Sequence, residues 1–183
     1  MNCSTAELIA KLEEIVGTDW VKTSEDDKQR YGRDWTRAFI VDPIAVVLPD
    51  SAETVQAIVR LANEVGVALV PSGGRTGLSG GAVASNKELV VAFDRMNQIL
   101  EFSASDRQVI CQAGVVTEQL QQFAEDKGLY YPVDFASAGS SQIGGNIATN
   151  AGGIKVIRYG MTRSWVEGLK VVTGTGEILE LNR

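Results

Sequence analysis

The chain has 183 residues, a hydrophobic content of 44% and a net charge of -6 at pH 7, which allows one domain of ordinary size or two small lobes. The acidic balance argues against nucleic-acid binding, which needs clustered Lys and Arg. Because the chain contains no histidine, it cannot itself supply Ser-His catalysis, histidine metal ligands or a histidine for covalent attachment of a cofactor.

The first half of the chain is predicted to alternate helices and strands. Polar caps, apolar faces with helical spacing and short apolar runs mark these elements. They are a helix from Ser4 to Gly17, a solvated turn or helix start in the charged run 24–28, a strand at 45–48, a helix from Ser51 to Gly66, and strands at 67–70 and 89–93. The strand, helix and strand between 45 and 70 predict a parallel crossover.

The second half changes to antiparallel character near Asn97. Turn residues between short apolar runs are typical of hairpins. The predicted elements are strands at 99–102 and 109–112, a helix capped by Thr117 and closed by Gly128, a short strand at 129–131, and strands at 166–173 and 178–181 around the turn 174–176.

A first glycine-rich stretch, from Pro71 to Gly81, directly follows the predicted strand 67–70. It reads Pro-Ser-Gly-Gly-Arg-Thr-Gly-Leu-Ser-Gly-Gly and holds five glycines in eleven residues. Main-chain N–H groups that lack bulky side chains can converge on an anion as a nest. The stretch therefore predicts phosphate binding at the carboxyl edge of a sheet. A mobile surface loop without a ligand is the alternative.

Two common phosphate loops do not match this stretch. The nucleoside-triphosphate loop needs Lys-Ser or Lys-Thr after its last glycine, whereas Gly81 is followed by Ala-Val-Ala-Ser-Asn. The dinucleotide fingerprint Gly-x-Gly-x-x-Gly is also absent, and the next ordered element reads as the strand 89–93. We therefore expect the anion between strands and not at the N-terminus of a helix.

A second glycine-rich stretch spans residues 139–160. It holds six more glycines, so the two stretches together contain eleven of the 19 glycines. Residues 135–154 include no charged side chain, although a solvated linker is normally more polar. This composition favours a surface that packs closely against something flat or extended.

Cysteine use and hydropathy predict a cytoplasmic protein. Cys3 and Cys111 give neither a disulfide framework nor a metal-ligand spacing. No run is long enough to span a bilayer, and the acidic N-terminal region does not resemble a secretory signal. Tyr130 and Tyr131 are interpreted as packing residues and not as a stacking platform.

Several motifs together resemble the FAD-binding domain of the vanillyl-alcohol oxidase and p-cresol methylhydroxylase superfamily. They are Pro71 to Gly81, Pro132-Val133-Asp134, Ile143 to Gly153, and Arg158-Tyr159-Gly160. Their order and spacing are similar to the superfamily from about Tyr31 to Leu181. Within it, the chain most resembles the flavoprotein subunit of glycolate oxidase and the D-lactate and D-2-hydroxyglutarate dehydrogenases.

The resemblance implies an α+β fold, namely a PCMH-type FAD-binding domain of two α+β lobes. A small parallel βαβ lobe is followed by a mixed or antiparallel lobe. The implied division is an N-terminal helical segment at 1–37 and a FAD-binding domain at 38–183, with lobes at about 38–96 and 97–183. The glycine-rich continuation that the family carries after the final hairpin is missing, so we expect a domain truncated at its C-terminus, without the substrate domain.

The implied cofactor is FAD, lying extended between the two lobes. The first stretch is expected to hold its pyrophosphate, and the second its flavin and the remaining diphosphate-ribityl portion. The implied cofactor-binding residues are Pro71, Gly73, Gly74, Arg75, Thr76, Gly77, Ser79, Pro132, Asp134, Gly139, Ser140, Gly144, Gly145, Thr149, Asn150 and Gly153. For the Arg75 side chain, a phosphate contact and a solvent-facing tip are both open.

In the family, a hydride passes from the α carbon of a 2-hydroxy acid to the flavin. A separate later domain holds the substrate carboxylate, the catalytic base and, in the nearest relatives, a divalent metal. No catalytic residue and no metal ligand is therefore assigned here, the isolated chain is expected to be inactive, and the electron acceptor is open. The alternatives are an oxidase of a sugar or an aromatic alcohol from the same superfamily, and a non-catalytic nucleotide-binding module.

Overall fold

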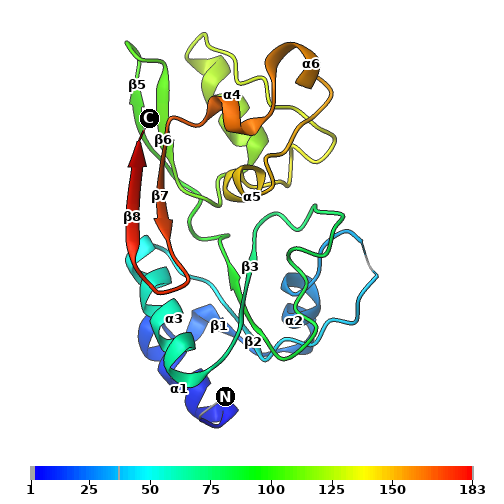
Figure 1. The fold of residues 1–183 in the computed structure, drawn as a ribbon, viewed down its shortest axis with the longest axis vertical. Helices are drawn as coiled ribbons and strands as arrows, with labels where there is room; N and C mark the ends of the chain where they lie inside the picture. The colour runs from blue at the N-terminus through cyan, green and yellow to red at the C-terminus, as the bar shows by residue number, and fades with distance from the viewer. Residues whose placement is uncertain (1–2, 37, 183) are drawn as a thin grey trace. The chain divides into compact units, whose positions relative to one another are not determined.

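The computed structural model describes residues 3–36 and 38–182, and it has the mixed α+β architecture that the sequence predicts (Figure 1). Contacts divide the chain into two compact units. Unit 1 consists of Met1–Arg95 with Glu167–Arg183, and unit 2 consists of Met96–Val166. None of the helices in the described ranges is long and apolar enough to cross a lipid bilayer.

Unit 1 combines helices with a four-stranded sheet and a hairpin. Its elements are α1 (Thr5–Val16), the 3-10 helix η1 (Thr18–Trp20), β1 (Val21–Lys22), α2 (Glu25–Tyr31), β2 (Ala45–Val47), α3 (Ala52–Val65), β3 (Leu69–Ser72), β4 (Leu89–Ala92), β7 (Gly168–Val172) and β8 (Ile178–Asn182). The sheet has the strand order β1-β2-β4-β3. Both β2 and β3 pair in parallel with β4, so the predicted strand-helix-strand unit is present with β4 between its strands.

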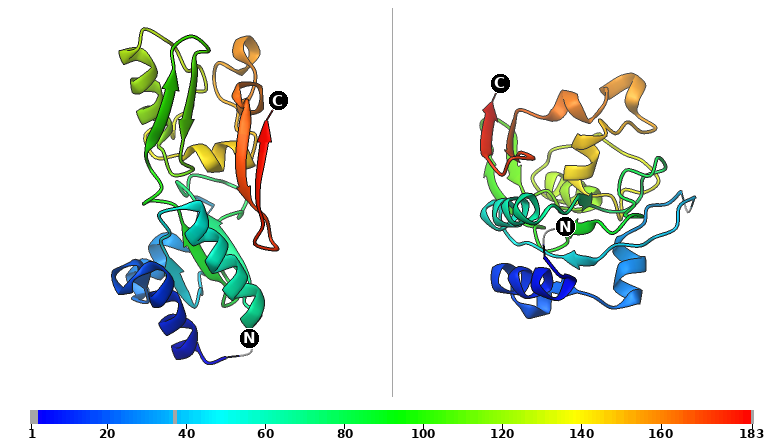
Figure 2. Two further views of the ribbon diagram at one scale, coloured as in Figure 1. Left: turned by 90° about the vertical axis from the view of Figure 1, so that its left-hand side faces the viewer. Right: turned by 60° about the horizontal axis from the view of Figure 1, so that its bottom comes forward.

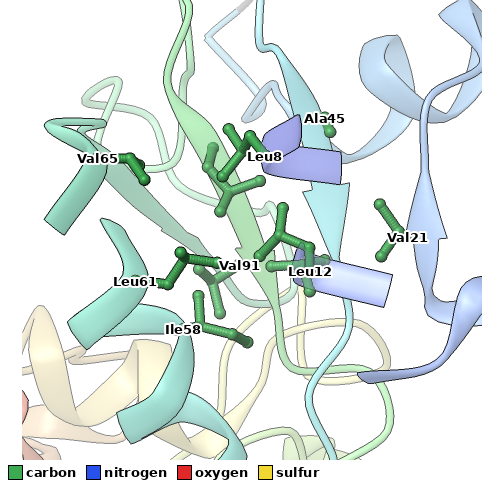
Figure 3. Packing of buried hydrophobic residues seen from close by; sticks show 10 residues of the cluster. Leu8, Leu12, Val21, Ala45, Ile58, Leu61, Val65 and Val91 are labelled. Carbon is green, nitrogen blue, oxygen red and sulfur yellow. The ribbon is translucent and has the colours of Figure 1, made fainter. Parts of the chain in front are cut away.

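Side chains of the sheet alternate between two apolar clusters. Val47 and Val91 face the cluster that α1 and α3 cover, whereas Val46 and Val90 belong to a second cluster with Tyr31 of α2. Figure 1 shows α1 and α3 on one side of these strands and α2 on the other, and Figure 2 shows α3 from two further sides. The first cluster, drawn in Figure 3, consists of Leu8, Leu12, Val21, Ala45, Val47, Ile58, Leu61, Val65, Leu89 and Val91.

The helix ends of unit 1 follow their local sequence signals. Ser4 forms the predicted capping box of α1, and the Ser51 hydroxyl accepts the Thr54 N–H at 3.1 Å at the start of α3. Gly66 ends α3 with a φ of 72°, a left-handed conformation that glycine adopts without steric cost. The charged run is the first turn of α2, where Ser24 is the N-cap.

The hairpin of β7 and β8 forms as predicted, but its contacts differ from the expected second lobe at 97–183. It packs on α3 of unit 1. Gln56 Nε2 donates to the Gly176 carbonyl at 2.8 Å, and Asn63 Nδ2 donates to the Gly174 carbonyl at 2.8 Å. Because α3 side chains satisfy the carbonyls of the turn, the end of the chain joins the first unit and not the second.

Unit 2 is an antiparallel hairpin with short helices. Its elements are β5 (Ile99–Ser103), β6 (Gln108–Cys111), α4 (Thr117–Asp126), α5 (Ile143–Ala148), α6 (Val156–Tyr159) and the 3-10 helix η2 (Thr162–Trp165). Buried Val115, Leu120 and Ile143 form its apolar core. The turn region before the hairpin, near Asn97, lies where the contacts of the two units separate.

Two local predictions in unit 2 are wrong, and two of its helices were not predicted. Thr117 does not cap α4, because its hydroxyl lies in the interior and the N-cap is Val116. Residues 129–131 form no strand. The helices α5 and α6 lie in the second glycine-rich stretch, where the low helix propensity of glycine hides a helical signal.

Replacing Ile58 by Ala should lower the free energy of unfolding by about 2–5 kcal/mol, since the side chain is fully buried in the first cluster. Urea unfolding followed by circular dichroism measures this change. Ile157→Ala is the matched control, because Ile157 is fully exposed and its loss should change stability by less than about 0.5 kcal/mol. Equal effects of the two substitutions would contradict the described core.

Candidate anion-binding and flavin-binding surfaces

The first glycine-rich stretch leaves the carboxyl end of the edge strand β3. Ser72, the last residue of β3, is buried, and its hydroxyl donates to the Tyr31 carbonyl at 2.8 Å. This bond ties the start of the stretch to the end of α2. The stretch therefore begins from a fixed point and not from a frayed strand end.

Main-chain N–H groups of this stretch are unpaired over several consecutive residues. Within the described chain, none of the N–H groups from Gly73 to Ser79 donates a hydrogen bond to a protein acceptor. Arg75 has a φ of 60°, and a left-handed residue in such a run is typical of anion-binding nests. Buried main-chain donors are almost always paired, whereas these residues are half-buried or exposed. The arrangement suits an anion with several acceptor oxygens.

The Arg75 side chain folds back onto unit 1. Its guanidinium donates two bonds to the Asp94 carboxylate, at 3.2 and 3.1 Å, and lies 4.8 Å from the centre of the Tyr31 ring. A bidentate pair of this kind fixes both partners. The sequence left two roles open for this side chain, a phosphate contact and a solvent-facing tip. Because only 18% of the side chain is exposed, it is not a solvent-facing tip.

A strap at 34–36 holds the far end of the stretch. Asp34 is 3% exposed, and its carboxylate oxygens accept the N–H of Thr36 at 3.0 Å and the N–H of Gly80 at 2.7 Å. The N–H of Trp35 donates to the Gly77 carbonyl at 2.9 Å. The strap therefore binds one carbonyl and one N–H of the stretch. The sequence analysis did not predict these contacts. The spacing Asp-x-Thr is typical of an Asx-turn, but it indicates only the local bond to Thr36.

In unit 2, a buried polar network holds the start of the second glycine-rich stretch. Thr117, Ser141 and Asn146 are each at most 5% exposed. The Thr117 hydroxyl lies 2.7 Å from the Ser141 hydroxyl and accepts a bond from Asn146 Nδ2 at 2.7 Å. Because a satisfied buried network specifies one arrangement, α5 is fixed against α4.

The glycines of α5 have two different environments. At Gly144, a Cβ atom would lie 2.8 Å from the Ala113 side chain, so α5 packs closely on the chain before α4. At Gly145, a Cβ atom would meet nothing within 4 Å, and the residue is exposed. Thr149 closes the helix by donating its hydroxyl to the Gly145 carbonyl at 2.9 Å. The outer side of α5 is therefore flat, small and uncharged.

The turn beyond α5 is held by a following segment. Asn150 has a φ of 49°, and its Oδ1 accepts the Arg163 N–H at 2.9 Å. Thr162 is buried, and its hydroxyl donates to the Ala151 carbonyl at 2.7 Å. These bonds fix the position of Asn150 next to Thr149.

Asp134 and Gly153 lie against each other. The Ile154 N–H donates to the Asp134 carbonyl at 3.1 Å, and a Cβ atom at Gly153 would overlap that carbonyl oxygen. Lys155 pairs with the Asp134 carboxylate at 2.8 Å and donates to the Tyr130 hydroxyl at 2.6 Å. The bond to Asp134, and then the bond to Tyr130, raise the pKa of Lys155 above its usual value.

An open groove of about 360 Å³ lies next to this pair. It is lined by Tyr130, Ile154, Lys155, Ile157, Arg158 and Tyr159. Tyr130 packs edge to face on Tyr159, and Tyr131 packs edge to face on Trp165. Tyr131 also packs against the apolar core of unit 2, which agrees with its interpretation as a packing residue. Tyr130 is 49% exposed and lines the groove, so packing describes only one side of its ring.

The sequence-predicted residues gather within each unit. Pro71, in β3, and the residues from Gly73 to Ser79 lie together in unit 1. Pro132 is buried, Gly139 and Ser140 lie on an exposed turn before α5, and the other predicted residues surround α5 and Asp134. The closing of both sets around one ligand stays a prediction. Among the described residues, no group of three or more Cys, Asp and Glu could hold a metal ion.

The α+β fold, the unpaired run of main-chain N–H groups after a parallel strand and the small uncharged surface are features expected of a protein that binds a nucleotide cofactor. The family model described as "FAD binding domain" matches residues 43–182. The chain therefore belongs to this family of FAD-binding domains.

Curated relatives share much of the sequence. The chain is 69% identical over 176 residues to a D-2-hydroxyglutarate dehydrogenase of Stutzerimonas stutzeri, covering 96% of this chain and 38% of the relative. It is 59% identical over 174 residues to one of Xanthomonas citri pv. viticola, covering 95% and 37%. It is 38% identical over 187 residues to a D-lactate dehydrogenase of Anaerostipes hadrus, covering 98% and 38%. The chain thus spans about two fifths of these relatives.

Solved structures share the fold. An alkyldihydroxyacetonephosphate synthase matches with a TM-score of 0.87 at 25% identity, covering 98% of this chain and 38% of that one. A p-cresol methylhydroxylase with bound substrate matches with a TM-score of 0.77 at 19% identity, covering 96% and 35%. The prediction of an α+β, PCMH-type FAD-binding domain is therefore confirmed.

The residues present fit FAD. A diphosphate needs several donors, and the N–H groups from Gly73 to Ser79 have no acceptor within the described protein. A flavin ring needs a flat neighbour, and the exposed side of α5 at Gly145 leaves free space above the main chain. When bound, FAD supplies the capacity to accept a hydride.

Gly153→Ala should destabilise unit 2 by about 1–3 kcal/mol, because the added methyl group overlaps the Asp134 carbonyl and overpacking forces the backbone to move. Urea unfolding followed by tryptophan fluorescence, in which Trp165 reports on unit 2, measures the loss. Gly145→Ala is the matched control and should not destabilise, since nothing lies within 4 Å of its new methyl group. Equal stability of the two variants would contradict the described contact.

Tyr131 should make stability fall between about pH 10 and pH 12. Burial raises the pKa of its hydroxyl from 10 to about 12, so the folded state keeps a proton that the unfolded state loses, and rising pH favours unfolding. Tyr131→Phe should remove this part of the loss in urea unfolding at pH 9 and pH 11, whereas the control Tyr159→Phe should retain it. An unchanged pH dependence in Tyr131→Phe would contradict the assignment.

Proposed function

We propose that the chain is the FAD-binding part of a flavin-dependent dehydrogenase that oxidises a 2-hydroxy acid. The observation that carries this proposal is the 69% identity to a D-2-hydroxyglutarate dehydrogenase over 176 residues. Because identity this high extends over almost the whole chain, the proposed substrate class is a D-2-hydroxy acid of the 2-hydroxyglutarate or lactate type. The D-lactate dehydrogenase among the relatives supports the same class.

We also propose which residues hold FAD. The main-chain N–H groups of Gly73, Gly74, Arg75, Thr76 and Gly77 bind the diphosphate, and the hydroxyl groups of Thr76 and Ser79 are further donors. Unpaired donors in this stretch support the assignment.

The second part of the proposed site binds the flavin and the ribityl chain. Its residues are Pro132, Asp134, Gly139, Ser140, Gly144, Gly145, Thr149, Asn150 and Gly153. The absence of charge from residue 135 to residue 154 and the open exposed side of α5 support this assignment. Because the substrate domain of the family is not part of this assignment, these residues bind and orient the cofactor and leave the base to other residues.

The cytoplasm is the proposed location. Cys3 and Cys111 are free thiols, as is usual in a reducing compartment. The two relatives at 69% and 59% identity are both bacterial.

Anaerobic substrate addition tests the proposed activity. D-2-Hydroxyglutarate should bleach the flavin absorption band of the purified full-length protein, because reduced flavin loses its visible absorption. L-2-Hydroxyglutarate carries the same groups with the opposite hand and is the matched control, which should bleach the band at least about tenfold more slowly. D-Lactate and glycolate define the chain length that is accepted.

The alternatives give different results in the same experiment. Bleaching by a sugar or an aromatic alcohol, without bleaching by any 2-hydroxy acid, would contradict the proposed substrate class. A full-length protein that binds FAD but is bleached by none of these compounds would favour the non-catalytic module.

A further inference from the structure

We propose that Asp34 is a positioning residue for the diphosphate-binding stretch. Its carboxylate fixes the stretch from Gly73 to Gly80 in the shape that directs consecutive main-chain N–H groups at a diphosphate. This inference rests on the proposed FAD site, and it assigns a function to a residue outside both glycine-rich stretches.

The Asp34 carboxylate is buried, and no cation of residues 3–36 or 38–182 pairs with it. It is 3% exposed, and none of the ion pairs in the described chain includes it. Burying a charge is costly unless hydrogen bonds compensate for the lost water. Here the compensation comes from two main-chain donors, Thr36 to Oδ1 at 3.0 Å and Gly80 to Oδ2 at 2.7 Å. Bonds of this kind, between N–H and a charged oxygen, are stronger than neutral ones.

The strap determines which way the peptide groups of the stretch point. Trp35 N–H donates to the Gly77 carbonyl at 2.9 Å. In a trans peptide the C=O and N–H point in opposite directions, so the N–H of Leu78 points away from the strap. The Gly77 carbonyl oxygen, which would repel an anion, is thus turned toward the strap. The Gly80 N–H also points to the strap, and the outward run of N–H groups ends before it.

A carboxylate is the side chain that this geometry requires. Both Asp34 oxygens accept a main-chain N–H, whereas Asn could accept with one oxygen and would place its amide hydrogens against the other donor. A neutral side chain of equal size therefore loses the hydrogen bond either from the Gly80 N–H or from the Thr36 N–H. Releasing Gly80 frees the end of the stretch. A less ordered stretch binds a diphosphate more weakly, because the entropy lost on ordering it reduces the binding free energy.

Asp34 could alternatively be only a local turn residue. Its bond to Thr36 is an i to i+2 contact, which stabilises Asx-turns in many proteins. Under that alternative, replacing Asp34 lowers stability and leaves the affinity for FAD unchanged. The bond to Gly80, 46 residues away in sequence, is the observation that favours the positioning role.

The test compares Asp34→Asn with wild type in the full-length protein. FAD is removed, and the dissociation constant for added FAD is measured by quenching of flavin fluorescence, together with the thermal unfolding temperature of the apoprotein. We expect the dissociation constant to rise at least about tenfold, as for the loss of one strong hydrogen bond. The visible spectrum at saturating FAD should stay that of wild type, since Asp34 orders the diphosphate end of the site.

Two further variants make the result decisive. Asp26→Asn removes the same charge from an exposed position of unit 1 and should leave the dissociation constant within about twofold of wild type. Asp34→Glu keeps the charge but moves the carboxylate, so it should weaken FAD binding as Asp34→Asn does. If Asp34→Asn unfolds, Asp34→Glu measures the same effect.

Three results would overturn the inference. Unchanged FAD affinity in Asp34→Asn with lowered stability would leave only the structural role. Wild-type affinity in Asp34→Glu would show that charge and not position matters. Absence of FAD binding in wild type and in Asp26→Asn would overturn the proposed function itself, and this inference with it.

Discussion

The site in unit 1 depends on one constraint: main-chain N–H groups that bind an anion cannot also hold their own loop in place. The run from Gly73 to Ser79 leaves its donors unpaired within the described protein. Its shape must therefore be held by other groups. Ser72, Arg75 and the Asp34 strap provide these contacts, through a hydroxyl, a guanidinium and a carboxylate that bond to other parts of unit 1 or to Gly80.

Unit 2 meets a related constraint by a different route. A flat uncharged surface has few polar groups that could form stabilising contacts. Contacts on its buried side therefore keep it ordered. The Thr117, Ser141 and Asn146 network fixes α5 from the buried side, and close packing at Gly144 and Gly153 fixes its neighbours. Asp134 and Lys155, which flank the uncharged region in sequence, pair with each other.

Local signals in the sequence predicted more of unit 1 than of unit 2. Ser51 and Gly66 mark the ends of α3 because caps act on adjacent residues. Thr117 carries the same cap signal, but tertiary bonding to Ser141 uses its hydroxyl instead. The glycine positions of the proposed site could be read from the sequence. The Asp34 contact could not, because its bond to Gly80 spans 46 residues and only the fold brings the two together.

Recognition by main-chain groups also explains why the fold does not identify the substrate. A diphosphate held by N–H groups places little demand on side-chain identity, so sequences at 25% and 19% identity can keep this architecture in a synthase and a methylhydroxylase. Side chains that contact substrate are under a different demand. The proposed substrate class therefore rests on the 69% identity to a D-2-hydroxyglutarate dehydrogenase and not on the architecture. Cofactor and substrate are thus inferred from separate observations, and the substrate class can be wrong while the FAD site stands.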